Sequence, residues 1–148
     1  MIRELVYEDL KSASQVLWKS FYEAEKNNHS MAGMELFRDL TDPVSLSINT
    51  FDGSVVLFGY FDNDVLKAVA ALKDKSHILM LYVLPSEQGM GIGKKLLAFM
   101  ERCCEGDVIT LNSSDFAIPF YQHFGFTICG ERNETDGLIS TPMKKRKA

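Results

Sequence analysis

Residues 77–105 constrain the fold most, because an apolar run, a glycine-rich loop and a helical pattern follow one another there. Residues 77–84 are apolar on both faces, which predicts a central strand that is covered on both sides. Pro85 ends this strand, and apolar residues recur at helical spacing from Gly91 to Glu105. The segment therefore predicts a buried strand joined by a short loop to an amphipathic helix.

The period of the apolar residues changes several times along the rest of the chain and predicts the other elements. Ser30 is a candidate N-cap for the second helix, Pro43 is expected beyond the end of that helix, and Asp136 and Gly137 are typical of a hairpin turn. We expect strands at 2–7, 54–61, 65–72, 107–111, 126–131 and 138–144, and helices at 9–27, 30–40 and about 114–124. This order indicates an α/β or α+β fold on a mixed sheet.

Length and composition are those of one globular domain. The chain has 148 residues, of which 46% are hydrophobic and 24% charged, and this excludes a disordered, collagen-like or coiled-coil protein. No apolar run reaches the roughly 18 residues of a membrane span, and the first residues contain no apolar signal core. We therefore expect an unprocessed cytoplasmic protein with no membrane partner.

The charge distribution is uneven. The net charge is −4, yet four of the positive charges lie in the last five residues, so the rest of the chain is more acidic than the total indicates. An acidic body argues against nucleic acid as the main partner and mildly favours a cationic one. We expect the basic end to be frayed, with a weak address signal as the alternative.

The cysteines point to no metal or disulfide chemistry. Cys103 and Cys104 lie inside the apolar helical pattern, and Cys129 stands apart from them. The sequence has no CxxC pair and no histidine at zinc-ligand spacing. We therefore expect small buried thiols in a reducing compartment and no metal site.

The loop at 88–94 has the features of a phosphate site. Alternate glycines let a ligand approach the main chain, and the first turn of the following helix offers free N–H groups. A Walker A loop is excluded, because Gln88 stands where its first glycine belongs and Lys95 where it needs Ser or Thr. A dinucleotide fingerprint fails as well, because Lys94 and Leu96 stand where its third glycine belongs.

Two motifs remain, Gln-x-x-Gly-x-Gly over residues 88–93 and Phe-Tyr-x-x-x-Gly-Phe over residues 120–126. Together they resemble the GNAT superfamily of acetyl-CoA-dependent N-acetyltransferases, best over residues 54–130. The resemblance implies one N-acetyltransferase domain over residues 1–148. Within it, 1–50 would supply acceptor-side helices, 54–130 the cofactor-binding core, and 138–148 the last strand and basic tail. It also implies a mixed, mostly antiparallel sheet flanked by about four helices and splayed between the strands at 77–84 and 107–111.

The resemblance also implies roles for individual residues. Backbone N–H groups from 88 to 94 would hold the pyrophosphate of coenzyme A, and the main chain of 82–84 would bind its pantetheine arm. One N–H near Tyr82 would polarise the thioester carbonyl. The cofactor-binding residues carried over are Tyr82, Val83, Leu84, Gln88, Gly89, Met90, Gly91, Ile92, Gly93, Lys94, Asn112, Ser114 and Tyr121.

The implied reaction is direct attack of a primary amine, from a small molecule or a peptide or protein, on the thioester of acetyl-CoA. Tyr121 would protonate the leaving thiolate, although packing in the aromatic core is the other interpretation of this residue. The strand at 77–84 carries no carboxylate, so the base stays open between Glu87, His77 and a water chain. The resemblance is also compatible with a homodimer. The alternatives are a non-catalytic acyl-CoA-binding or scaffold module and a nucleotide-dependent kinase, which the Walker A mismatch argues against.

Overall fold

The structure is a computed structural model that describes residues 1–147. Its eight strands in this part of the chain form one sheet in the order β1-β2-β3-β4-β5-β8-β6, with β7 paired to β8. Their bounds are β1 Ile2–Glu4, β2 Val55–Asp62, β3 Val65–Lys73, β4 His77–Val83, β5 Val108–Ser113, β6 Thr127–Ile128, β7 Asn133–Thr135 and β8 Leu138–Arg146. All neighbouring pairs are antiparallel except β4 and β5, which are parallel. The expected mixed, mostly antiparallel sheet is confirmed.

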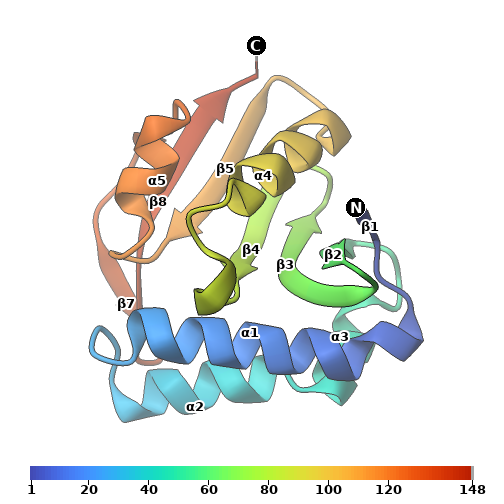
Figure 1. Ribbon diagram of the computed structural model, residues 1–148. Helices are drawn as coiled ribbons and strands as arrows, with labels where there is room; N and C mark the ends of the chain where they lie inside the picture. The colour runs from blue at the N-terminus through green and yellow to red at the C-terminus, as the bar shows by residue number, and fades with distance from the viewer. Residues whose placement is uncertain (148) are drawn as a thin grey trace.

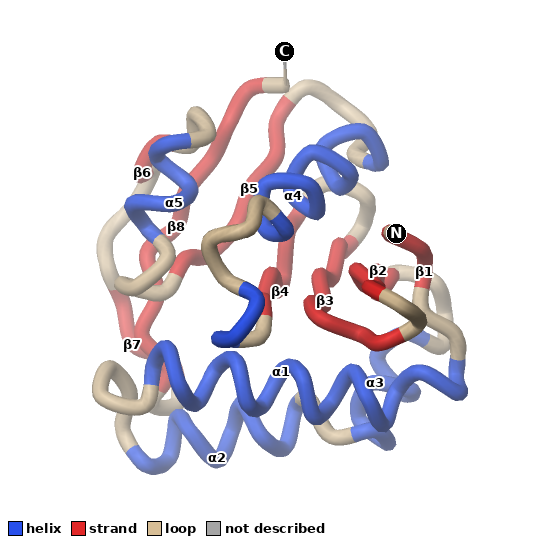
Figure 2. The backbone as a smooth tube through the Cα atoms, in the orientation of Figure 1, coloured by secondary structure: helices blue, strands red, loops and turns tan. Residues whose placement is uncertain are grey.

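Helices cover both faces of this sheet. They are α1 Leu10–Glu25, α2 Met31–Leu40, α3 Pro43–Thr50, α4 Ile92–Cys103 and α5 Ile118–His123, with short 3-10 turns at Tyr7–Asp9 and Pro85–Glu87. In Figure 1, α1 and α2 run side by side across the lower part of the view, whereas α4 and α5 lie above them. The backbone tube in Figure 2 shows the loop that leads from the short turn at Pro85–Glu87 to the start of α4. Within residues 1–147, no helix has the length and apolar composition needed to cross a membrane.

Strand β3 divides the interior into two hydrophobic cores. Ala68, Ala70 and Leu72 pack in the cluster that contains α4, while Val69 and Ala71 pack in the cluster that contains α1. Because side chains alternate across a strand, an apolar strand of this kind needs a helix layer on each side. This explains why helices cover both faces of the sheet.

Helix α3 is absent from the sequence-based prediction, which placed Pro43 only beyond the end of α2. Asp42 caps this helix by accepting a hydrogen bond from the Ser45 N–H at 2.9 Å, and Pro43 occupies the first turn. Proline is favoured there because its fixed φ suits a helix and its missing N–H would have no helical partner. The described chain therefore has five α-helices rather than about four.

Strands β4 and β5 separate soon after they meet. They pair only at His77 with Thr110 and at Ile78 with Leu111. On the other side of β4, the register shifts because Ile78 and Met80 pair with consecutive residues of β3, which leaves Leu79 as the extra residue of a β-bulge. The predicted splay is confirmed, and the bulge lies where it begins.

The splay changes the burial of β4. The sequence predicts a strand covered on both sides, but within the strand only Ile78 is fully buried, and Leu79 is 41% exposed. The side that would contact β5 opens into a gap instead. The apolar residues of β4 therefore line a cavity.

The basic end of the chain is ordered in the sheet, so the expectation of a frayed end is wrong. Strand β8 continues to Arg146, which pairs with Val108, and the Lys147 N–H donates to the Asp107 carbonyl at 2.7 Å. The Lys145 ammonium lies 2.7 Å from Glu101 on α4. Backbone pairing with a central strand outweighs the mutual repulsion of these positive side chains.

Candidate active site

The loop before α4 presents backbone N–H groups. Gly89 and Gly91 have φ of +84° and +81°, in the left-handed region that glycine adopts without strain. The first helical bond of α4 runs from the Lys95 N–H to the Gly91 carbonyl at 3.1 Å. The N–H groups of residues 92–94 therefore have no acceptor within the helix and face the loop. Such a helix start favours a negatively charged group.

Gly93 allows a close approach of α4 to α5. A Cβ at this position would lie 3.3 Å from the Phe120 ring and 3.8 Å from Val83, so a larger residue would displace the packing there. Gln88 fixes the loop to β4, because its side-chain amide donates to the Val83 carbonyl at 3.1 Å. Its backbone N–H is directed to the Pro85 carbonyl at 3.4 Å, so the unpaired run of amides begins after Gln88, one residue later than expected.

A cavity of about 530 Å³, here called the first cavity, occupies the gap between β4 and β5. It is lined by β4, the glycine loop, the end of β5 and α5. Of the residues predicted to bind the cofactor, all except Leu84 and Met90 line this cavity. Met90 is exposed, and Leu84 packs in the core on the α1 side.

The backbone of β4 faces the gap at residues other than those predicted. The Leu84 N–H donates to the Lys67 carbonyl at 3.0 Å, so this group faces β3. Because backbone groups alternate along a strand, Tyr82 also faces β3, whereas Leu81 and Val83 face the gap. The structure therefore directs the Leu84 N–H and the backbone groups of Tyr82 to β3, while Leu81, which was not predicted, faces the gap beside Val83.

Tyr121 lines the first cavity although only 6% of it is exposed. Its ring packs edge-on against Phe120 and Phe126, with centroids 5.3 and 5.6 Å away. Burial, and after it the negative charge of Glu25, raises the pKa of the Tyr121 hydroxyl. Burial, and after it the charge of Glu25, also holds the pKa of Tyr82 well above its ordinary value. Tyr121 therefore belongs both to the core and to the cavity wall, and its hydroxyl keeps its proton at neutral pH.

The two candidate bases have other partners. The Glu87 carboxylate lines the first cavity, but it forms an ion pair with the Lys67 ammonium at 3.0 Å. This ion pair links the turn before the loop to β3. His77 is hydrogen-bonded through Nδ1 to the Thr110 hydroxyl at 2.7 Å, at the paired end of β4 and β5. Burial, and then Lys73, lowers the pKa of His77. Neither cavity is lined by His77.

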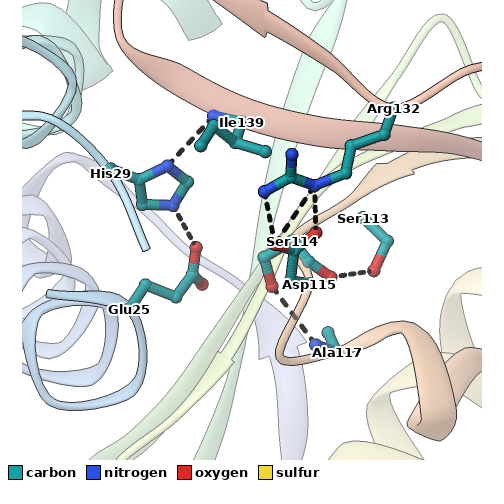
Figure 3. A network of polar contacts seen from close by, with 8 residues as sticks. All are labelled: Glu25, His29, Ser113, Ser114, Asp115, Ala117, Arg132 and Ile139. Atoms are coloured by element: carbon teal, nitrogen blue, oxygen red, sulfur yellow. Dashed lines mark hydrogen bonds and ion pairs between the residues drawn. The ribbon is translucent and has the colours of Figure 1, made fainter. Parts of the chain in front are cut away.

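Glu25, at the end of α1, is a carboxylate that the sequence-based prediction missed. It is 2% exposed and lines the first cavity. Its Oε1 atom lies 2.8 Å from Nε2 of His29, whose Nδ1 accepts a hydrogen bond from the Ile139 N–H at 3.0 Å (Figure 3). One signal was available, because Glu25 follows Leu17 and Phe21 at four-residue steps and so falls on the buried face of the helix.

A second cavity, of about 740 Å³, lies between the three N-terminal helices and the β7–β8 hairpin. Both cavities share a set of lining residues, which are Glu25, Leu79, Met80, Tyr82, Asn112 and Ser114. The two cavities therefore meet at the splayed part of β4.

Ser114 and its neighbours shape the far wall of the junction. The Ser114 hydroxyl accepts a hydrogen bond from the Ala117 N–H at 3.3 Å, before the start of α5 (Figure 3). Asp115 forms an ion pair with Arg132 at 2.8 Å.

The cysteines lie away from both cavities. Burial of the thiol raises the pKa of Cys104, and none of the three cysteines lines either cavity within residues 1–147. The same part of the chain holds no cluster of potential metal ligands.

Comparison with solved structures gives the same fold. A GCN5-related N-acetyltransferase named aminotransferase, class-II, from Rhodopseudomonas palustris is 22% identical, with a TM-score of 0.88 over 99% of this chain and 94% of that one. The PaiA N-acetyltransferase of Thermoplasma acidophilum, in complex with coenzyme A, is 22% identical, with a TM-score of 0.79 over 99% and 98%. The ribosomal-protein-S18-alanine N-acetyltransferase of Escherichia coli is 19% identical, with a TM-score of 0.72 over 100% and 94%.

Sequence comparisons place the chain in a family. It is 29% identical over 100 residues to the amylovoran biosynthesis glycosyltransferase AmsE of Erwinia amylovora, and this match covers 68% of the chain. The chain spans about a third of the length of that curated relative, since the match covers 34% of it. The model of the acetyltransferase (GNAT) domain family matches residues 19–147. The chain therefore belongs to the GNAT acetyltransferase family.

Proposed function

We propose that this protein transfers the acetyl group of acetyl-CoA to a primary amine. The observation that carries the proposal is the first cavity, which has unpaired loop amides at one end and the protonated Tyr121 in its wall. Family membership and the coenzyme A complex of the PaiA relative support the choice of acetyl donor. Residues 1–50 would then form the acceptor side, and residues 54–130 the side that binds coenzyme A.

The residues present fit coenzyme A. The N–H groups from Gly89 to Lys94 would bind its pyrophosphate, because Gly89 and Gly91 leave open space above the main chain and the helix start favours an anion. Backbone groups of Leu81 and Val83 face the gap, where they would bind the amides of the pantetheine arm. Coenzyme A would supply the acetyl group as a thioester at the inner end of this gap.

Tyr121 would act as the general acid. A raised pKa keeps the Tyr121 hydroxyl protonated at neutral pH, so a proton is available at this hydroxyl for the thiolate as the C–S bond breaks. General acid catalysis contributes about 10²–10⁴-fold to a rate. The amine would attack the thioester directly, which requires no cysteine near the site.

The Tyr121→Phe variant tests this role, with Tyr60→Phe as the matched control on β2. We expect Tyr121→Phe to lower kcat by about 10²–10⁴-fold, because the thiolate would leave without a proton. The rate of free-thiol release from acetyl-CoA with a panel of amines gives kcat, and calorimetry gives the affinity for coenzyme A. That affinity should be unchanged in Tyr60→Phe and should fall much less than kcat in Tyr121→Phe, whose side chain lines the first cavity.

Two results would contradict the proposal. Binding of acetyl-CoA without turnover on any amine would indicate a non-catalytic binding module with the same fold. Equal kcat values in Tyr121→Phe and Tyr60→Phe would show that Tyr121 is not the general acid, although acetyl transfer itself would still occur.

A further inference from the structure

Glu25 is a buried carboxylate without a cation beside it. Within residues 1–147, its one partner at ion-pair distance is His29, and both side chains are almost completely buried. A backbone N–H can only donate, so the bond from Ile139 requires an unprotonated Nδ1, and the His29 ring is neutral with its proton on Nε2. His29 therefore orients the carboxylate without neutralising it. Glutamate is almost never fully buried unless it is paired with a cation, so this position marks Glu25 as a candidate functional group.

Glu25 also lies where the two cavities meet. It lines both of them, together with Tyr82 at the splayed part of β4. Its negative charge acts on the hydroxyls of Tyr82 and Tyr121. The carboxylate therefore faces the place where an acetyl donor in the first cavity and an acceptor in the second would come into contact.

The second cavity fits an acceptor with a single charge. Its walls are largely apolar, with Phe37, Leu46 and Leu57 among the buried residues. Apart from the neutral His29, the titratable charges that line it are those of Glu25 and of Lys73, which is exposed. Glu25 can compensate the charge of one ammonium group. A second ammonium group in the same cavity would find no carboxylate to compensate its charge. A volume of about 740 Å³ lies in the range of small-molecule sites.

We propose that the second cavity binds a small apolar monoamine and that Glu25 binds its ammonium group and takes its proton. This inference rests on the proposed acetyl transfer and adds its base and the class of its acceptor. Glu25 takes one of the three ammonium protons, and the freed lone pair forms the new C–N bond at the thioester carbon. When the C–S bond breaks, Tyr121 gives its proton to sulfur and regains one from the amide nitrogen. The products are an amide, a free thiol and one proton on Glu25 for release.

The first test compares Glu25→Gln with Glu23→Gln, which makes the same change at an exposed position of α1. With pentylamine as acceptor, we expect kcat/KM to fall by about 10²–10⁴-fold in Glu25→Gln and to stay unchanged in Glu23→Gln. With 2,2-difluoropentylamine, which is far less basic and has a much larger uncharged fraction at neutral pH, the loss should be much smaller. Equal activity of the two variants, or equal losses with the two amines, would overturn the role of Glu25 as a base.

The second test concerns the acceptor. Pentylamine and 1,5-diaminopentane have the same chain length and differ by one ammonium group, so we expect kcat/KM to favour the monoamine by about tenfold or more, because burying the second charge is costly. A preference for the diamine would overturn the acceptor class. A higher kcat/KM for Phe-Gly-Gly amide than for 2-phenylethylamine would also overturn it, because the second cavity would then bind a peptide N-terminus rather than a small monoamine.

Binding measurements separate this inference from the proposed function. We expect calorimetry to detect pentylamine binding to the coenzyme A complex of the wild type and of Glu23→Gln, and at least about tenfold weaker binding to that of Glu25→Gln. If Glu25→Gln binds pentylamine as tightly as the wild type does, Glu25 does not bind the ammonium group. If the wild type acetylates no amine, the proposed function fails. If it acetylates monoamines while Glu25→Gln equals Glu23→Gln, only the present inference fails.

Discussion

Three buried or half-buried side chains that exchange protons have different surroundings. Glu25 faces two cavities, Tyr121 lines one, and His77 is enclosed between two paired strands. Contact with a cavity, rather than the residue type, therefore separates the candidates for chemistry from the residue with a structural role. His77 acts on stability, because its pKa is lowered by burial.

That difference predicts an acid sensitivity. The unfolded chain protonates His77 near the ordinary histidine pKa of about 6.5, while the folded protein resists protonation, so stability is lost as the pH falls below that value. We expect the free energy of unfolding in urea to fall less between pH 7.5 and pH 5.5 in His77→Gln than in the wild type. His123→Gln, at an exposed position, should keep the wild-type dependence. The same dependence in all three proteins would assign the acid sensitivity to other groups.

Single residues differed in how far the sequence predicted them. Tyr121 and the glycines of the loop lie in contiguous motifs, where spacing alone identifies a candidate. Glu25 is in no motif and lies more than fifty residues before the loop, so only the packing of α1 against β4 brings it to the junction. Its position on the buried face of α1 was visible, but periodicity cannot show which cavity a side chain will reach.

At the scale of elements, the loop and α4 form one unit whose shape depends on left-handed glycines. Gly91 is the N-cap of α4 and has a φ of +81° with open space around it. Gly106 has a φ of +83° and equally open space, in a loop that lines neither cavity. The two positions therefore separate the general cost of a left-handed residue from its effect at the site.

Gly91→Ala and Gly106→Ala make that comparison. Both should lose about 1 kcal/mol of unfolding free energy, because a Cβ disfavours the left-handed conformation. Only Gly91→Ala should weaken coenzyme A binding several-fold in calorimetry, since relief of the strain turns the loop amides away. Equal affinities in the two variants would show that the amides of this loop do not bind the ligand.

Elements were predicted well where one strong pattern decides, and less well where local signals compete. Helix α4 and strands β2 and β3 lie within one or two residues of their predicted bounds. Pro43 is compatible with the end of one helix or the start of the next, and its position after Asp42 decides for the start. The bulge at Leu79 is set by pairing with β3, so the direction in which β4 presents its backbone was not accessible from the sequence.

At the scale of the molecule, strand β8 holds together the part of the sheet that lies beyond the splay. This last strand pairs with β5, β6 and β7, and its basic end reaches the start of β5. The sheet beyond the splay therefore depends on residues near the C-terminus for its backbone hydrogen bonds. Surface ion pairs such as that of Lys145 with Glu101 contribute about 1 kcal/mol or less.

Deleting residues 144–148 tests this arrangement. We expect a loss of about 3 kcal/mol or more and a fall in Tm of about 10 °C, because three of the six pairs with β5 and one of the two pairs with β6 are broken. A variant with glutamine at positions 144–147 keeps the strand and loses its charges, so its Tm should change little. A truncated protein as stable as the wild type would show that the end of β8 contributes nothing to the fold.

The sparse pairing of β4 with β5 has a consequence for the lifetime of the protein. Two residue pairs join the halves of the sheet at the start of the gap, and an extended pantetheine arm would supply the bridging hydrogen bonds that are missing beyond them. A ligand that binds only the native state stabilises it by about 2.7 kcal/mol at a concentration one hundred times its Kd. Resistance to unfolding and proteolysis would thus follow the supply of this ligand, and its scarcity would shorten the survival of the protein.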